Sequence, residues 1–85
     1  MKPVEIYTSP FCGFCSAAKK LLDQKGVSYS ETNVMLDPRK KQEMLKRANG
    51  SHTVPQIFVG GEHVGGCDEL YALERAGRLD PMLAG

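Results

Sequence analysis

Cys12 and Cys15 stand three residues apart in the run Cys12-Gly13-Phe14-Cys15, a spacing suited to disulfide exchange. The nucleophile of that reaction is a thiolate, and a free cysteine with a pKa of about 8.5 is only a few per cent ionised at neutral pH. If Cys12 caps a helix, unpaired N–H groups at the positive end of the helix dipole would stabilise its thiolate. Cys15, one turn further along, would be less exposed. The spacing therefore predicts Cys12 as the nucleophile and Cys15 as the resolving thiol.

Three other interpretations compete for the cysteine pair. A structural zinc site needs four ligands, and the remaining candidates, Cys67, His52 and His63, do not form a second closely spaced pair. A purely structural disulfide would be unusual in a reducing compartment and strained across two residues. The third interpretation, two unreactive core cysteines, is disfavoured by the position of the pair between an expected strand and an expected helix.

The residues around the pair predict the elements that must position it. Alternation of apolar and polar residues favours strands, spacing of three or four favours helices, and glycine, proline and aspartate mark their ends. The expected elements are a strand at 4–7, a helix from Phe14 to Lys25 ended by Gly26, a strand at 27–34, a helix from the N-cap Asp37 to about residue 49, strands at 56–59 and 62–65 joined by a Gly60-Gly61 turn of mirror-image geometry, a helix from about residue 66 to Gly77, and a final turn at 80–83 that packs on the sheet.

This order predicts the fold class and its organisation. Strand, helix, strand, helix, strand, strand, helix indicates an α/β chain of thioredoxin-like fold, with a four-stranded mixed sheet flanked by helices on both faces. No linker or repeat interrupts the pattern, so we expect one domain over residues 1–85.

Composition limits the partners. With 11 Lys and Arg against 10 Asp and Glu, the net charge of +1 gives no strong field toward nucleic acid or an anionic membrane. No stretch is apolar enough for a secretion signal or a membrane span. We therefore expect no nucleic-acid or membrane partner and a cytoplasmic location.

Two further motifs have both a structural and a functional interpretation. Pro55 in Thr53-Val54-Pro55 is either a simple terminator before a strand or, if its peptide bond is cis, the means of exposing the Val54 backbone to an extended peptide. Gly65-Gly66-Cys67-Asp68 is either a glycine turn or a site whose free N–H groups bind a carboxylate while Asp68 accepts from an ammonium. An amino acid moiety carries both of those groups on one carbon.

In these motifs the chain resembles the glutaredoxin family over essentially its whole length, and most of all small bacterial dithiol glutaredoxins. The resemblance implies a monomeric glutathione-dependent oxidoreductase that reduces protein disulfides and glutathione mixed disulfides. It also implies a cis Pro55, with Val54 pairing to the cysteinyl backbone of glutathione. The implied glutathione-binding residues are Phe14, Gln42, Thr53, Val54, Pro55, Gly66, Cys67 and Asp68.

Within that set, the resemblance gives the residues separate roles. Phe14 would flank the sulfur, Cys67 and Asp68 would hold the γ-glutamyl end, and Gln42 would contact the glycyl carboxylate with Lys46 nearby. For Gln42 the competing interpretation, an ordinary solvated helix residue, is the favoured one. Cys67 is either a small helix-start residue without chemistry or a third thiol open to oxidation.

The sequence also departs from the family pattern. Dithiol glutaredoxins usually have Pro and Tyr between the cysteines, whereas Gly13-Phe14 is similar to the Cys-Gly-Phe-Ser group that handles iron-sulfur clusters. A [2Fe-2S] cluster, held between two chains by Cys12 of each and two glutathiones, is therefore an alternative; no other metal is expected. Ser9 replaces a Lys that is common before the nucleophile. A third interpretation, a thioredoxin-like protein reduced by a reductase, would leave Gly66-Cys67-Asp68 without a purpose.

Overall fold

One mixed sheet organises the chain, and a computed structural model describes all of its residues, 1–85. The central strand β1 (Val4–Thr8) pairs parallel with β2 (Tyr29–Asn33) and antiparallel with β3 (Gln56–Val59), and β3 pairs antiparallel with β4 (Glu62–Gly65). The strand order is β2-β1-β3-β4. The antiparallel register places Tyr7, near the end of β1, opposite Gln56, at the start of β3. The loop after β1 and the loop before β3 therefore lie at the same end of the sheet.

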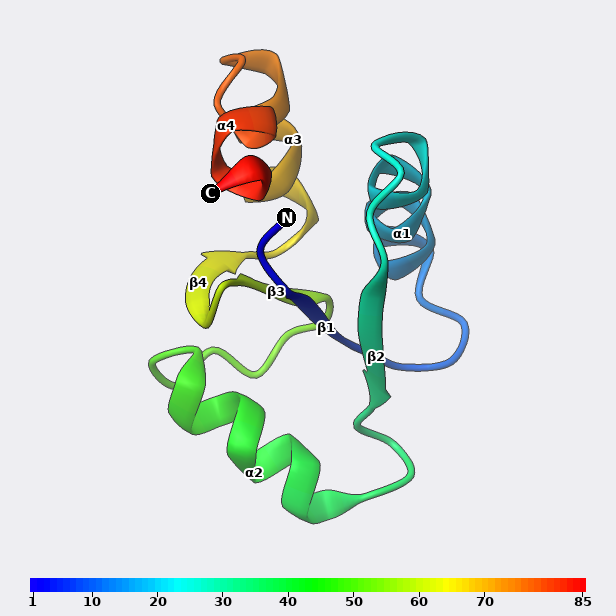
Figure 1. The fold of residues 1–85 in the computed structure, drawn as a ribbon. Coiled ribbons are helices and arrows are strands. Elements are labelled where there is room, and N and C mark those ends of the chain that lie inside the picture. The colour runs from blue at the N-terminus through cyan, green and yellow to red at the C-terminus, as the bar shows by residue number, and fades with distance from the viewer.

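Four helices cover the two faces of this sheet: α1 (Gly13–Gln24), α2 (Pro38–Arg47), α3 (Cys67–Arg75) and α4 (Leu79–Ala84). Figure 1 shows α1, α3 and α4 on one side and α2 alone on the other. Side chains alternate across a strand, so Ile6 enters the larger apolar cluster with Leu22, whereas its neighbour Tyr7 enters the smaller one with Met44. The predicted thioredoxin-like arrangement is confirmed.

Local signals explain where the helices and the hairpin turn begin and end. The Asp37 side chain caps α2 by accepting from the Arg39 N–H at 2.9 Å, and proline occupies the first helical position. Gly26 follows α1 with φ of +69°, as a C-terminal glycine cap requires. Gly60 and Gly61 both have positive φ, 59° and 82°, which confirms the predicted mirror-image turn.

The structure corrects two predicted elements. The second strand is shorter than predicted, since Val27 and Val34 are buried but lie outside β2. The C-terminal segment is a helix, α4, where a turn was predicted. Leu79 and Leu83 of α4, four residues apart, are buried in the larger cluster, and the Lys2 N–H donates to the Leu83 carbonyl at 2.9 Å. None of the four helices is long and apolar enough to cross a membrane.

Candidate active site

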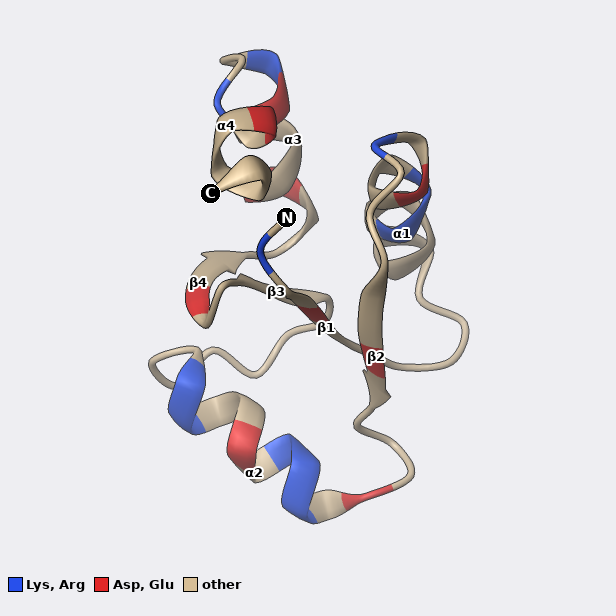
Figure 2. Ribbon diagram, viewed as in Figure 1, with Lys and Arg blue, Asp and Glu red and all other residues tan.

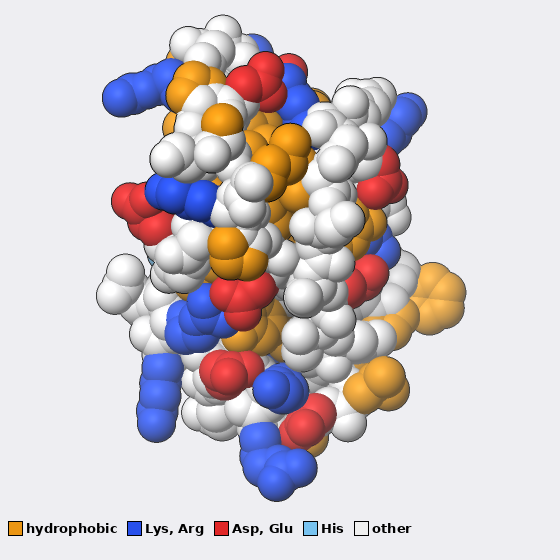
Figure 3. Space-filling view, in the orientation of Figure 1, with side chains coloured by type: hydrophobic (Ala, Val, Ile, Leu, Met, Phe, Trp, Pro, Cys, Tyr) orange, Lys and Arg blue, Asp and Glu red, His pale blue; other side chains and the backbone are white.

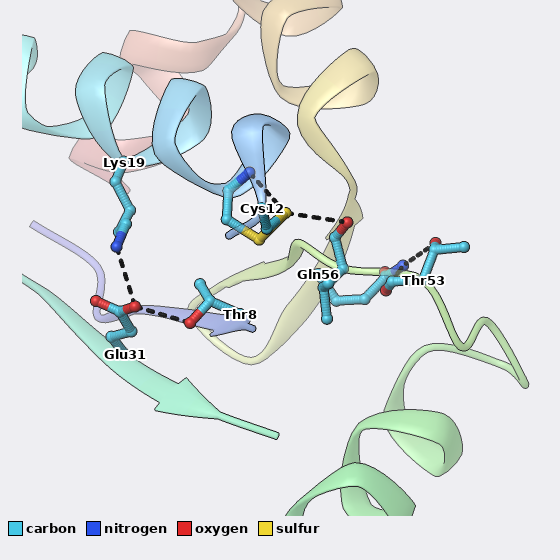
Figure 4. Close-up of a disulfide and its surroundings, with 8 residues drawn as sticks. Thr8, Cys12, Lys19, Glu31, Thr53 and Gln56 are labelled. Carbon is cyan, nitrogen blue, oxygen red and sulfur yellow. Dashed lines mark hydrogen bonds and ion pairs between the residues drawn. A yellow bond between two sulfur atoms is a disulfide. The ribbon is translucent and has the colours of Figure 1, made fainter. Parts of the chain in front are cut away.

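Cys12 is the N-cap of α1, as predicted. Its backbone is extended (φ −102°, ψ 107°), and its Sγ accepts from the Cys15 N–H at 3.1 Å. Cys12 is half-buried, whereas Cys15 is only 2% exposed. The two sulfurs are joined in a disulfide, so the structure describes the oxidised form (Figure 4). A thiolate at Cys12 Sγ in this position would be stabilised by the same N–H and by the positive end of α1.

The segment Thr53-Val54-Pro55 lies directly against this sulfur. Cys12 Sγ is 3.8 Å from the Val54 carbonyl oxygen, and the Val54–Pro55 bond is cis. A cavity opens on this side of Cys12, and we call it the Pro55 groove. Its lining contains seven of the eight predicted glutathione-binding residues together with one that was not predicted, Glu69: Phe14, Thr53, Val54, Pro55, Gly66, Cys67, Asp68 and Glu69.

One wall of the Pro55 groove is the N-terminus of α3. Gly66 is the N-cap, and its carbonyl accepts the N–H of Leu70 at 3.0 Å. The three intervening N–H groups, of residues 67–69, therefore precede the first helical hydrogen bond. A side chain at position 66 would place its Cβ 3.3 Å from the Pro55 carbonyl oxygen, so glycine lets the helix approach the loop closely. The first-turn N–H groups of α3 are those for which the sequence predicts anion binding, and that role stays a prediction.

Glu69 is the residue of this wall that the sequence reasoning missed. Its Oε1 accepts from the Gly66 N–H at 2.7 Å, which satisfies one of the otherwise unpaired donors of the helix start. A glutamate three residues after the N-cap is a known signal of helix starts, so this contact of Glu69 could have been predicted from the sequence. Next to it, burial and then the charges of Asp68 and Glu69 raise the pKa of the Cys67 thiol.

Gln42 is not brought into the Pro55 groove. It is exposed on α2 and lines a separate cavity with charged residues of the same helix: Arg39, Glu43, Lys46 and Arg47. Figure 2 marks acidic positions between and beside the basic positions of α2, and Figure 3 shows basic and acidic side chains next to one another in the lower part of the molecule, not a patch of one sign. The role of Gln42 stays a prediction.

A second cavity, on the other side of the disulfide, holds a polar cluster that was not predicted. Thr8 Oγ1 donates to Glu31 Oε2 at 2.7 Å, and Lys19 Nζ lies 3.1 Å from the same oxygen (Figure 4). These two hydrogen bonds, with Thr8 the larger contributor, hold the pKa of Glu31 below its ordinary value. Nothing in the sequence pairs these three residues until the parallel register of β1 and β2 is known.

The structure gives no support to the zinc interpretation of the cysteines. It brings no three His, Cys, Asp or Glu side chains together as a metal site. His63, one of the candidate ligands, instead lies 2.7 Å from the Gln56 side chain.

Comparison with known proteins identifies the family. The Glutaredoxin family profile matches residues 4–64. Over 83 residues the chain is 52% identical to glutaredoxin 3 of Escherichia coli strain K12, covering 98% of this chain and 99% of that protein. The chain belongs to the glutaredoxin family. It is also 51% identical to a Pseudomonas aeruginosa glutaredoxin over 84 residues, 99% of each chain.

Solved structures agree with this assignment. The fold matches a crystal structure of a buckwheat glutaredoxin–glutathione complex with a TM-score of 0.88 and 36% identity, covering 98% of this chain and 77% of that one. The predicted family is thus confirmed, and with it the activity: this glutaredoxin is a glutathione-dependent thiol-disulfide oxidoreductase.

Proposed function

We propose that this glutaredoxin reduces glutathione mixed disulfides and protein disulfides through Cys12 as the attacking thiolate and Cys15 as the resolving thiol. The proposal rests on the position of Cys12 Sγ. The sulfur sits at the N-terminus of α1, accepts the Cys15 N–H, and lies 3.8 Å from the Val54 carbonyl at the rim of the Pro55 groove. Cys15 is buried behind it, as a thiol should be that meets only a sulfur already bound to Cys12.

We propose that glutathione occupies the Pro55 groove. The Val54 backbone would pair with its cysteinyl residue, and the first-turn N–H groups of α3 would bind its γ-glutamyl carboxylate. The exposed Asp68 carboxylate would accept from the ammonium, and Phe14, which is 66% exposed, would flank the sulfur. The buckwheat glutaredoxin crystallised with glutathione supports this assignment. Gln42 and Lys46 of α2 would reach only the glycyl end.

In the monothiol route only Cys12 reacts. Its thiolate attacks the glutathione sulfur of a mixed disulfide, the Cys12–glutathione bond forms as the substrate–glutathione bond breaks, and the substrate leaves as a thiolate that takes a proton from solvent. A second glutathione thiolate then attacks the adduct. Glutathione disulfide leaves, and the Cys12 thiolate is restored. One glutathione thiol and the mixed disulfide thus give the substrate thiol and glutathione disulfide, so one disulfide bond is broken and one is formed.

In the dithiol route Cys15 also reacts. Cys12 attacks a protein disulfide and forms a mixed disulfide, releasing one substrate thiolate. Cys15 then loses its proton and attacks Cys12 Sγ, which releases the second substrate thiolate and leaves the Cys12–Cys15 disulfide seen in the structure. Two glutathione molecules reduce that disulfide and depart as glutathione disulfide.

A glutathione-coupled assay tests these roles with two substrates, a glutathionylated peptide and a protein disulfide. We expect Cys12→Ser to abolish both activities and Cys15→Ser to spare deglutathionylation while impairing protein-disulfide reduction. Glu62→Ala, at an exposed position on β4 outside the groove, is the control and should retain both. Activity that survives Cys12→Ser would refute the nucleophile, and equal loss of both activities in Cys15→Ser would refute the division of roles.

We further propose that this glutaredoxin acts as a monomer in the cytoplasm, where a reducing glutathione pool keeps its substrates turning over. The alternative is a [2Fe-2S] cluster shared by two chains, held by Cys12 of each chain and by two glutathiones, and reconstitution distinguishes the two. After anaerobic reconstitution with iron, sulfide and glutathione, we expect a colourless monomer on size exclusion. A brown dimer would overturn this part of the proposal.

A further inference from the structure

A buried glutamine, Gln56, connects the hairpin to the segment that lines the Pro55 groove. Gln56 is 3% exposed, although its side chain carries one acceptor and two donor hydrogens. Its Oε1 lies 2.7 Å from Nε2 of His63 on β4. Its Nε2 lies 3.0 Å from the Thr53 carbonyl oxygen, with the Ser51 and Thr53 hydroxyls at 3.1 and 3.2 Å. All of the polar atoms of this amide are therefore engaged.

The chemistry of these groups fixes the direction of the hydrogen bonds. A backbone carbonyl can only accept, so Gln56 must turn its NH₂ group toward Thr53 and its oxygen toward His63. The amide oxygen can also only accept, so a neutral His63 ring must carry its proton on Nε2. The result is one directed chain, in which His63 donates to Gln56 and Gln56 donates to Thr53.

Because the peptide bond is planar, the hydrogen bond to the Thr53 carbonyl also sets the direction of the Val54 N–H. The carbonyl of Thr53 and the N–H of Val54 belong to one peptide unit, and in a trans unit they point in opposite directions. The only cis bond of the chain is the next one, Val54–Pro55. Because Gln56 draws the Thr53 carbonyl toward the protein interior, the Val54 N–H is turned away from the interior.

We propose that His63 and Gln56 are positioning residues for glutathione: they hold the Thr53 carbonyl inward and thereby aim the Val54 N–H into the Pro55 groove, where it pairs with the cysteinyl backbone. This inference rests on the proposed function of the groove. Neither residue lines the groove. Figure 4 shows Gln56 meeting Thr53 on the opposite side of Cys12 from Glu31.

His63 has a second contact, which allows its donor and its packing to be separated. Its ring lies against Phe58, with the ring centroids 5.0 Å apart and an interplanar angle of 31°. His63→Phe keeps an aromatic ring for this contact but removes the N–H. His63→Gln loses the ring but keeps an N–H at the distance of the imidazole Nε2. Glu62→Ala, at an exposed position on the same strand, is the control for perturbing the hairpin.

The first experiment measures KM and kcat for a glutathionylated peptide. We expect His63→Phe and Gln56→Leu to raise KM by about 3–10-fold, the factor that one hydrogen bond supplies, with kcat within about twofold. His63→Gln should stay within about twofold of wild type in both constants, and Glu62→Ala should be unchanged. A wild-type KM in His63→Phe, or an equal defect in His63→Gln, would overturn the proposal. So would a fall in kcat at constant KM, because that pattern reports a smaller folded fraction.

The second experiment needs no variant and no activity. Nitrogen-15 NMR of the wild-type protein, at a pH where His63 is neutral, should show the proton on Nε2 and a scalar coupling from the Gln56 NH₂ to the Thr53 carbonyl carbon. A proton on Nδ1 would overturn the proposal. A wild-type protein that failed to deglutathionylate the peptide would refute the proposed function, whereas normal wild-type activity with an unaffected His63→Phe would refute only the positioning role.

Discussion

Arg47 connects α2 to the central strand, and the loss of stability on its replacement can be worked out from its contacts. Its guanidinium donates to both carboxylate oxygens of Glu5, at 3.0 and 2.8 Å, and to the Tyr7 hydroxyl at 2.9 Å. The guanidinium carbon also lies 4.1 Å from the centre of the Phe58 ring. We expect Arg47→Ala to loosen α2 from the sheet because all of these contacts disappear together.

The size of this effect follows from the exposure of the groups. The side chains of Arg47 and Glu5 are 27% and 41% exposed, so their ion pair is of the surface kind and contributes about 0.5–1 kcal/mol. The hydrogen bond to Tyr7 adds about 1 kcal/mol and the contact with Phe58 about 0.5–1 kcal/mol. Arg47→Ala should therefore cost about 2–3 kcal/mol and lower the melting temperature by roughly 10–15 °C.

A double-mutant cycle in urea isolates the ion pair. Glu5→Ala, Arg47→Ala and the double variant should give a coupling energy of about 0.5–1 kcal/mol near pH 7. The hydrogen bonds from Arg47 outweigh burial and hold the pKa of Glu5 below its ordinary value. A carboxyl whose pKa is lower in the folded state stabilises the protein above its unfolded pKa and loses that contribution as the pH falls through the folded pKa.

The pH dependence of the Glu5–Arg47 coupling energy provides the test that could refute this reasoning. The coupling energy should be smaller at about pH 3 than near pH 7, because protonated Glu5 no longer pairs with Arg47. Glu31 titrates in the same range, but its contribution cancels within the cycle because all four proteins contain it. A coupling below about 0.3 kcal/mol near pH 7, or one that persists unchanged in acid, would show that the Glu5–Arg47 ion pair does not help to hold α2 on the sheet.

Three further predictions concern the C-terminal half. Glu69→Ala should cost about 1 kcal/mol in urea unfolding because the Gly66 N–H loses its acceptor, while Glu69→Gln should cost less than half of that. Leu79→Ala should cost about 2–5 kcal/mol, since that side chain is fully buried, against less than about 0.5 kcal/mol for Leu36→Ala, whose side chain is 81% exposed. In the reduced protein near pH 8, iodoacetamide should alkylate Cys67 more slowly than a cysteine in a short peptide, because its pKa is raised; an equal rate would contradict its burial.

Much of the fold could be predicted because its signals are local. The cap of α2 at Asp37, the glycine that ends α1 and the Gly60-Gly61 turn each depend on residues within a few positions of one another. The helix α4 was missed because Pro81 and a short length favoured a turn, although Leu79 and Leu83 have helical spacing. Proline in the first turn of a helix costs no hydrogen bond, so Pro81 is compatible with α4.

The candidate site also contains some residues that local patterns predict and others that they do not. Cys12 at the helix N-cap and the residues of the Pro55 groove follow from motifs that are contiguous in the sequence, so they could be predicted. The contact of Thr8 and Lys19 with Glu31 depends on the parallel register of β1 and β2, which no local pattern specifies. Residues that act directly at a site are therefore easier to find than those that support it.

The hydrogen-bond chain to Thr53 shows why the supporting residues need the complete sheet. Gln56 and Phe58 are two residues apart on β3, so their side chains emerge on the same face. The register of β3 and β4 places His63 opposite Phe58, and an irregularity in the pairing follows at once between Ile57 and Phe58. A shift of one residue would turn the side chain at position 63 to the other face and leave the buried oxygen of Gln56 without a donor. The orientation of the Val54 amide thus depends on a strand pairing that lies outside the motif containing it.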